Sequence, residues 1–242
     1  MEAGGAGSSP AATLPVMCGR YGFGNPARLG SLPLGVVLPP LGPRFNVAPS
    51  QAVPLVGQEA NTRFAALANW GLIPFWAKDP GIGHDLANAR ADGIASKPSF
   101  RSAFKARRAV LPADLYYEWQ VVPGHKGKQP WCIRMPDEAP FVMAALFERW
   151  APVDDPVAQS RLTCCVITTE ANAATIAIHH RMPAIIPVAD IEVWLNPATP
   201  SAVAQALLRP YEGPLVTYQV KTWVNTASHD DAQCAAPLER WD

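Results

Sequence analysis

The stretch FVMAALF, residues 141–147, decides the fold class because it is short, apolar and free of proline and glycine. A run of this length is more typical of a buried β-strand than of a helix. Further strand-like runs lie on both sides of it. They are residues 65–72, 108–111, 115–120, 131–134, 161–168 and 216–220. A chain with so many short strands builds its core from β-sheets.

Helical spacing and flanking proline or asparagine residues predict four short helices, at residues 99–107, 171–178, 189–195 and 201–208. The expected helices do not alternate regularly with the expected strands, which disfavours a doubly wound parallel sheet. We therefore expect an α+β fold with mainly antiparallel sheets, a barrel-like core, flanking short helices and a single domain.

Composition excludes several classes of protein. The 242 residues contain no apolar run near the roughly 18 residues of a membrane span. A hydrophobic share of 49% and 8 tryptophans exclude a disordered chain. Twenty basic and 20 acidic residues cancel, which argues against a polybasic nucleic-acid arm. Residues 78–134 are nonetheless basic and residues 135–242 acidic, which fits either a local phosphate-binding face or an ordinary solvated surface.

Five cysteines occur without any CxxC spacing, which disfavours a disulfide framework or a zinc ribbon and favours a reducing cytoplasm. We expect no metal and no organic cofactor, because no ligand spacing is present. Most of these cysteines lie in apolar runs or near the end of the chain, whereas Cys18 lies between Met17 and a glycine followed by arginine. Residues 1–16 are small and polar and lack a basic region before an apolar core, so we expect a disordered extension rather than a secretory signal. The domain is expected to span residues 17–238.

Two polar residues in unusual surroundings are candidates for chemistry. Glu118 lies among aromatic residues in a strand-like run, so its carboxylate is either on a solvent-facing edge or desolvated with a raised pKa. His179 ends a helix-like segment, where it serves either as a cap or as a general acid. The adjacent His180 is expected to point away from His179 and into solvent.

Several motifs, in this order, resemble the SRAP family (SOS-response-associated peptidases, abasic-site processing proteins). They are MCGRY at 17–21, RFNVAPS at 44–50, WGLIPFWAKD at 70–79, NAR at 88–90, KPSFRSAF at 97–104, YYEW at 116–119, HHRMP at 179–183 and VN at 224–225. The resemblance covers roughly residues 17–238.

This resemblance implies a sensor of abasic sites in single-stranded DNA, which traps the ring-opened sugar as a thiazolidine crosslink. Cys18 would be the nucleophile, Glu118 the carboxylate beside its amine, and His179 the acid that assists sugar ring opening and crosslink reversal. Asn88 would hold the crosslinked residue. The residues expected to line the DNA-binding cleft are Arg20, Asn46, Arg90 and Arg101. The resemblance further implies single-stranded DNA as partner, no membrane, a monomer, and a cytoplasmic protein that acts at the nucleoid.

The chemistry requires an amine and a thiol on the same residue, and only an N-terminal cysteine has both. Sixteen residues precede Met17 in this chain, so Cys18 has only an amide nitrogen as written. Either translation begins at Met17 and that methionine is removed, or residues 1–17 are cut away afterwards. We expect the mature protein to begin at Cys18.

Two other functions stay open. A thiol peptidase or autopeptidase would use the same Cys18, Glu118 and His179 and would tolerate an internal cysteine. A non-catalytic module for single-stranded DNA would bind in a salt-sensitive way and form no covalent adduct.

Overall fold

The computed structural model describes residues 18–152 and 160–238. The expected extension at residues 1–16 therefore lies outside the described residues. No helix in the described part of the chain is long and apolar enough to cross a membrane.

Twelve strands are described in these ranges, joined by short helices. The strands are β1 (Arg20–Phe23), β2 (Arg44–Val47), β3 (Ala52–Glu59), β4 (Thr62–Trp70), β5 (Asn88–Arg90), β6 (Arg108–Ala113), β7 (Leu115–Val121), β8 (Lys128–Arg134), β9 (Phe141–Trp150), β10 (Arg161–Glu170), β11 (Arg181–Pro183) and β12 (Val216–Gln219). The α-helices are α1 (Pro26–Leu29), α2 (Arg101–Ala106), α3 (Ile191–Leu195) and α4 (Ser201–Ala206). The 3₁₀ helices are η1 (Pro80–His84), η2 (Pro136–Glu138), η3 (Val188–Asp190), η4 (Thr222–Asn225) and η5 (Ala232–Ala235).

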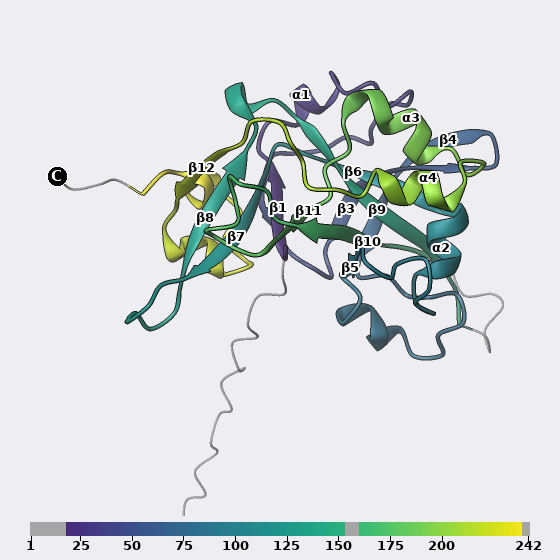
Figure 1. Cartoon of the computed structure of the whole chain (residues 1–242), viewed down its shortest axis with the longest axis horizontal. Helices are drawn as coiled ribbons and strands as arrows, with labels where there is room; N and C mark the ends of the chain where they lie inside the picture. The colour runs from purple at the N-terminus through teal and green to yellow at the C-terminus, as the bar shows by residue number, and fades with distance from the viewer. Residues whose placement is uncertain (1–17, 153–159, 239–242) are drawn as a thin grey trace, which may run out of the picture.

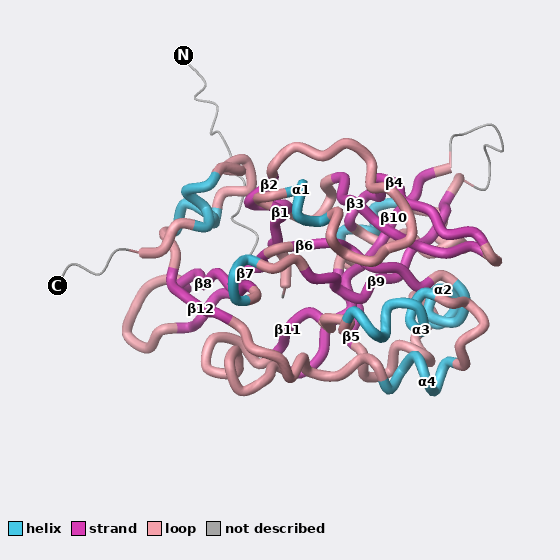
Figure 2. The backbone as a smooth tube through the Cα atoms, turned by 90° about the horizontal axis from the view of Figure 1, so that it is seen from above, coloured by secondary structure: helices cyan, strands magenta, loops and turns pink. Residues whose placement is uncertain are grey.

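The larger sheet closes into a barrel. Its strands follow the order β10-β4-β3-β6-β9, and β9 pairs again with β10. All pairings in this ring are antiparallel except β4 with β10. Closure leaves no free edge in the ring and encloses the apolar residues of the strands, which form the main core. In Figure 1 the barrel lies toward α2, α3 and α4, and Figure 2 shows these helices gathered on one side of it.

Strand β10 changes partners along its length. Its first half pairs with β4 and β9, whereas its second half pairs with β5 and β11. The change on the β4 side occurs at Gly71, whose φ of 144° is a conformation that other residues rarely adopt. A Cβ there would lie 2.7 Å from the carbonyl oxygen of Gly83, so only glycine fits this crossing of two segments. The turn after β4 thus lets β5 approach β10.

The second sheet has the order β12-β8-β7-β1-β2 and is entirely antiparallel. One face carries Tyr21 and Tyr116 into the main core. The other face carries Tyr117 and Trp119 and is covered by Val224 and other apolar residues near the C-terminus. Figure 1 shows β1 between the barrel strands and the group of β7, β8 and β12, with the C-terminal segment in yellow against that group.

The α+β class with mainly antiparallel sheets is confirmed, and each of the seven expected strands overlaps an observed one. The helix expected at residues 171–178 is wrong, because this segment forms successive turns. The backbone N–H groups of Ile176 and His179 bond four residues back, whereas that of Ile178 bonds three residues back to Thr175, so the segment makes separate turns and no regular helix. Asn172 Oδ1 caps the first turn by accepting from the backbone of Ala174 and Thr175 and from the Thr175 hydroxyl.

The C-terminal segment is fastened to β2 by two buried polar residues. The amide nitrogen of Asn46, which is fully buried, contacts the carbonyl oxygens of Val224, Thr226 and His229 at 3.1, 3.0 and 2.7 Å. Asp230 accepts from the backbone N–H groups of residues 45 and 46 and pairs with the guanidinium of Arg44. These bonds hold η4 and η5 over the outer face of the second sheet.

Replacing Asn46 by aspartate should therefore destabilise the protein. Asn46→Asp keeps the shape of the side chain but turns its donor into an oxygen facing three carbonyl oxygens. We expect the free energy of unfolding to fall by about 3 kcal/mol at pH 7 in urea denaturation. The matched control is Asn61→Asp in the exposed turn between β3 and β4, which should change it by no more than about 0.5 kcal/mol. Equal effects of the two substitutions would contradict the role given to Asn46.

Candidate active site

Cys18 and Glu118 form the centre of the site. Cys18 immediately precedes β1, and Glu118 lies on β7, which pairs with β1. The backbone nitrogen of Cys18 donates to Glu118 Oε1 at 2.9 Å, and its thiol donates to the same oxygen at 2.7 Å. Both residues are 3% exposed. One carboxylate oxygen therefore contacts both the nitrogen and the sulfur of Cys18.

Burial changes the acid–base properties of this pair. Loss of contact with water raises the pKa of Glu118 to about 7. The hydrogen bonds from Cys18 lower this pKa, but by less than burial raises it. Burial and then the charge of Glu118 raise the pKa of the Cys18 thiol well above its usual range. The sequence left open whether Glu118 faces solvent or is desolvated. Glu118 lies on the inner face of β7 and is therefore desolvated.

His179 approaches the other oxygen of Glu118. Its Nδ1 lies 3.9 Å from Glu118 Oε2. The turns at residues 171–178 bring it there, because Gln120 of β7 donates to the carbonyl oxygen of Ala177 at 2.8 Å. Burial lowers the pKa of His179 below its usual value. Nδ1 lies 3.1 Å from the backbone nitrogen of Arg181 and 3.2 Å from its carbonyl oxygen, so it accepts from the first in one tautomer and donates to the second in the other.

The two histidines differ from expectation in one respect. His180 is exposed, as expected. Its ring does not point away from His179, however, since the ring centroids are 4.4 Å apart with 35° between the planes. The expectation assumed a helix, and the turns that replace the helix let adjacent side chains share one side.

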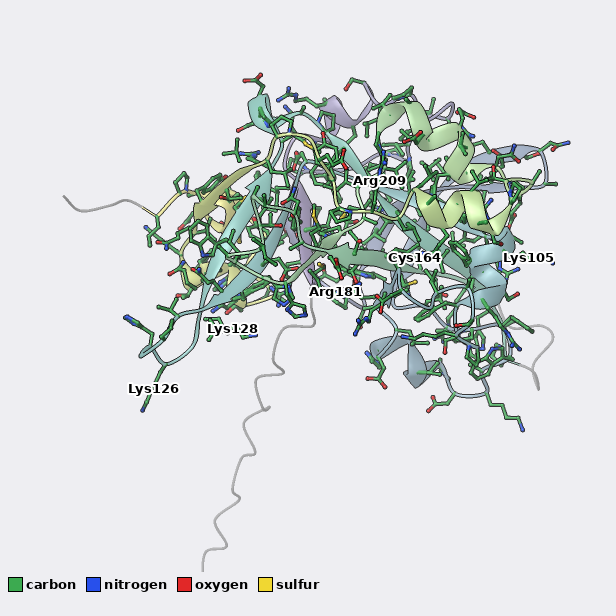
Figure 3. The ribbon with its side chains drawn as sticks, viewed as in Figure 1. Lys105, Lys126, Lys128, Cys164, Arg181 and Arg209 are labelled. Carbon is green, nitrogen blue, oxygen red and sulfur yellow. The ribbon has the colours of Figure 1, made fainter. Side chains whose placement is uncertain are left out.

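Arg181 is a buried cation that the sequence reasoning left without a role. It is 4% exposed, and its guanidinium donates to the carbonyl and hydroxyl oxygens of Thr168 on β10. It also contacts Asp92 at 3.3 Å. Its charge acts on Cys18 in the direction that lowers the thiol pKa. The one sequence feature that could have marked Arg181 as a site residue is its position between a histidine and an apolar run. Figure 3 shows Arg181 near the centre of the molecule, where the two sheets meet.

Asn88 and Arg90 are brought to the same region by β5. Asn88 pairs with Val166 of β10, and Arg90 pairs with Thr168, the residue that accepts from Arg181. Asn88 is half-buried and Arg90 is exposed. Arg90 forms an ion pair of 2.8 Å with Asp92. Asp92 therefore links the buried Arg181 to the exposed Arg90 through two ion pairs.

Arg20 and Asn46 lie on the outer face of the second sheet rather than in the pocket of Cys18. Arg20 donates to Asn46 Oδ1 at 3.0 Å and to the carbonyl oxygens of Val224 and Asn225 at 2.7 and 3.3 Å. Asn46 is fully buried, which corrects the expectation that its side chain lines a DNA-binding cleft. Its role is to hold Arg20 and η4 in place. Arg20 keeps partial exposure at the edge of the site.

Two further cations lie near the rim. Arg101 is exposed at the first residue of α2, and no hydrogen bond or ion pair ties it to the residues around Cys18. Lys128 begins β8 opposite Val121. Its positive charge acts to lower the pKa of both Glu118 and His179. Figure 3 shows Lys128 along the β7–β8 hairpin. Among the described residues, no group of three or more His, Cys, Asp or Glu side chains is placed to hold a metal ion.

Comparison with known families gives a match over most of the chain. Residues 17–227 match the family "SOS response associated peptidase (SRAP)". The chain belongs to the SRAP family. The match begins one residue before Cys18 and includes every residue of the site described above.

Relatives of this SRAP chain carry the name abasic site processing protein. YoqW of Bacillus subtilis is 38% identical over 194 residues, which cover 79% of this chain and 84% of YoqW. HMCES of Gallus gallus is 32% identical over 229 residues, which cover 81% of this chain and 67% of HMCES. A protein from Bacteroides thetaiotaomicron of known structure has 31% identity and a TM-score of 0.72, covering 82% of this chain and 87% of its own.

Burial of Glu118 in this SRAP fold predicts a pH-dependent stability. The unfolded carboxyl loses its proton near pH 4.5 and the folded one near pH 7, so the folded state binds the proton more tightly in between. Stability is therefore lost as pH rises from about 4.5 to 7. Since a pKa difference of one corresponds to about 1.4 kcal/mol, the loss is about 3 kcal/mol. Glu118→Gln should remove it, so that the variant gains about 3 kcal/mol over the full-length wild type between pH 4.5 and 8 in urea denaturation.

The control for this measurement is Glu192→Gln. A hydrogen bond from Arg63 lowers the pKa of Glu192, so this carboxyl stabilises the fold above its unfolded pKa and loses that effect as pH falls. This control should gain nothing over the wild type as pH rises. An unchanged pH profile in Glu118→Gln would show that Glu118 is not desolvated.

Proposed function

We propose that this SRAP protein captures abasic sites in single-stranded DNA as a thiazolidine crosslink, after Cys18 has become the N-terminal residue. The observation that carries the proposal is the contact of one carboxylate oxygen, Glu118 Oε1, with both the nitrogen and the sulfur of Cys18. The nitrogen is an amide here and occupies the place of the future amine. The names of the relatives support DNA that contains abasic sites as the target.

The reaction needs no oxidant and no cofactor. The Cys18 amine attacks the aldehyde carbon of the ring-opened sugar, and loss of one water gives an imine. The sulfur then bonds to the same carbon, the C=N electron pair moves to nitrogen, and the thiol proton ends on that nitrogen. The product is a five-membered ring. Amine and thiol on one residue make the second step intramolecular, which favours it strongly.

Glu118 is suited to manage the amine proton. An α-amine has an ordinary pKa of about 7.7–8.0, and burial raises the pKa of Glu118 to about 7. Because the two values are close, one proton passes readily between amine and carboxylate. The low polarity of the pocket favours the uncharged pair, in which the amine is free to attack. A solvent-exposed glutamate would instead hold the amine in its unreactive charged form.

His179 is placed to assist opening of the sugar ring. Its lowered pKa keeps the imidazole neutral near pH 7. In the tautomer in which Nδ1 accepts from the backbone of Arg181, Nε2 carries the proton and would donate a hydrogen bond to the ring oxygen of the sugar. Asn88 and Arg90 on β5 would hold the nucleotide and its phosphate at the mouth of the pocket, and Arg101 would contact the strand farther away.

The depth of the pocket favours a single strand. Cys18 is almost fully buried, so the damaged sugar must leave the path of the backbone to reach it. In a duplex this costs the stacking and pairing energy of the neighbouring bases, whereas a single strand bends freely. The residues of the site all come from one chain, so a monomer suffices.

The thiol peptidase is the less favoured function. A peptidase cysteine needs a lowered thiol pKa and a basic partner such as histidine. Here burial and Glu118 raise the pKa of Cys18, and the hydrogen bond of the thiol goes to the carboxylate rather than to His179. Removal of residues 1–17, whether by translation from Met17 with loss of methionine or by cleavage, is the step that would expose the amine.

The start of the chain provides the decisive test. A protein that begins at Cys18 should form a covalent adduct with an abasic single-stranded oligonucleotide that survives denaturing gel electrophoresis. The full 242-residue chain, the Nα-acetylated Cys18 form and the Cys18→Ser variant should form none. Adduct formation by a full-length chain whose intact mass still includes residues 1–17 would overturn the proposal. Binding without an adduct by the Cys18-start protein would support the non-catalytic module instead.

Glu118 and His179 should affect separate parts of the same reaction. We expect Glu118→Gln to slow crosslink formation by about 100-fold at pH 7, a usual contribution of a general base.

We expect His179→Ala to slow formation or reversal by about tenfold or more. An abasic analogue that carries a free aldehyde but no hydroxyl able to close the sugar ring should bypass His179 but not Glu118. Wild-type rates in both directions for His179→Ala would remove it from the mechanism.

A further inference from the structure

An exposed aromatic stack lies on η4. The rings of Trp223 and His229 are nearly parallel, with centroids 3.3 Å apart and 10° between the planes. Trp223 is 39% exposed, although tryptophan is usually more buried. Because His229 covers one face of the indole, the exposed surface lies on the opposite face and the edge. That surface offers a flat aromatic platform to solvent.

Hydrogen bonds fix the orientation of this platform. The indole nitrogen of Trp223 donates to Asp231 Oδ2 at 3.3 Å, and His229 Nδ1 lies 2.9 Å from the carbonyl oxygen of Trp223. The carbonyl of His229 in turn accepts from the buried Asn46. A ring held in place before binding loses little conformational freedom when a ligand stacks on it.

The platform adjoins the reactive end of β1. Arg20, two residues from Cys18, donates to the carbonyl oxygens of Val224 and Asn225, which directly follow Trp223. Trp119, next to Glu118, donates to Asn225 Oδ1 at 2.7 Å. Trp223 lies over the outer face of the second sheet and Glu118 on its inner face, so a strand bound at both would pass the end of β1 that carries Cys18. That passage is short, because Cα atoms two residues apart, such as those of Cys18 and Arg20, are separated by about 7 Å at most.

The charges around Trp223 favour a nucleic acid. Lys221 is exposed beside it and Arg20 is partly exposed below it. Of the nearby carboxylates, Asp230 is paired with Arg44. Asp231 accepts from Trp223 and from the backbone of Gln233, which leaves its negative charge in place against the two cations. Cations that flank an aromatic face are the usual combination for a backbone phosphate with a stacked base.

We propose that Trp223, supported by His229, is a stacking platform for an undamaged base that flanks the abasic site. The inference rests on the proposed function for the position of the lesion, but base stacking itself needs no covalent chemistry. Stacking tolerates any base, so the platform adds affinity without sequence preference. It would hold the strand while the missing base leaves the sugar free to enter the pocket of Cys18.

The test measures binding of an undamaged, fluorescently labelled single-stranded oligonucleotide by anisotropy, with the full chain and with the Cys18-start protein. Trp223→Ala should raise the Kd by about tenfold, and Trp223→Phe by less, because the smaller ring still stacks. Leu67→Ala, which removes an exposed apolar side chain from β4 in the other sheet, is the control and should leave the Kd unchanged. An unchanged Kd in Trp223→Ala overturns the proposal.

A second measurement locates the base. Oligonucleotides with 5-iodouracil at each position beside the abasic site are irradiated with the protein, and the tryptic peptide that begins at Thr222 is examined by mass spectrometry. A photoadduct at Trp223 from one or two neighbouring positions is expected, and adducts only elsewhere would overturn the platform. If no covalent abasic adduct forms at all, the proposed function fails, yet the anisotropy arm still decides the role of Trp223.

Discussion

Glu118 is placed where a carboxylate loses almost all contact with water, and its hydrogen bonds come from the nitrogen and sulfur of Cys18. A buried charge is costly unless it is paired, so the group either takes up a proton or finds a donor. The burial that makes the ionised Glu118 costly also sets its acid–base behaviour. It couples the protonation of the Glu118 carboxyl to the protonation of Cys18.

This coupling depends on two sheets that meet at the pocket. The second sheet supplies Cys18 and Glu118 through the pairing of β1 with β7. The barrel supplies Arg181, Asn88 and the approach of His179 through the two late partners of β10. Because β10 leaves β4 and β9 halfway along, its second half is open to β5 and β11. A longer β4 would occupy the place of β5 beside β10 and would remove Asn88 and Arg90 from this region.

Much of the fold could be predicted from local patterns. Apolar runs such as residues 141–147 and 161–168 identify strands without knowledge of their neighbours. Short strands such as β5 and β11, with three residues each, have no pattern of their own and exist only because β10 offers them partners. The segment before His179 is expected to be a helix because its first turn is capped as a helix is, and spacing does not reveal that the later backbone bonds become irregular. The resemblance to a family pointed to Cys18, Glu118 and His179, which the structure brings together, but it did not show that Asn46 is buried against the C-terminal segment.

The fastening of the C-terminal segment to β2 has a consequence for the order in which the protein is made. Arg20 belongs to the first strand synthesised, whereas the carbonyls of residues 224 and 225 that hold it, and the Asp230 that secures them, emerge from the ribosome last. In a nascent chain, Arg20 and Asn46 therefore lack these carbonyl partners until nearly all of the domain has been synthesised. The outer face of the second sheet is completed only at that stage, so the N-terminal and C-terminal parts of the domain become stable together.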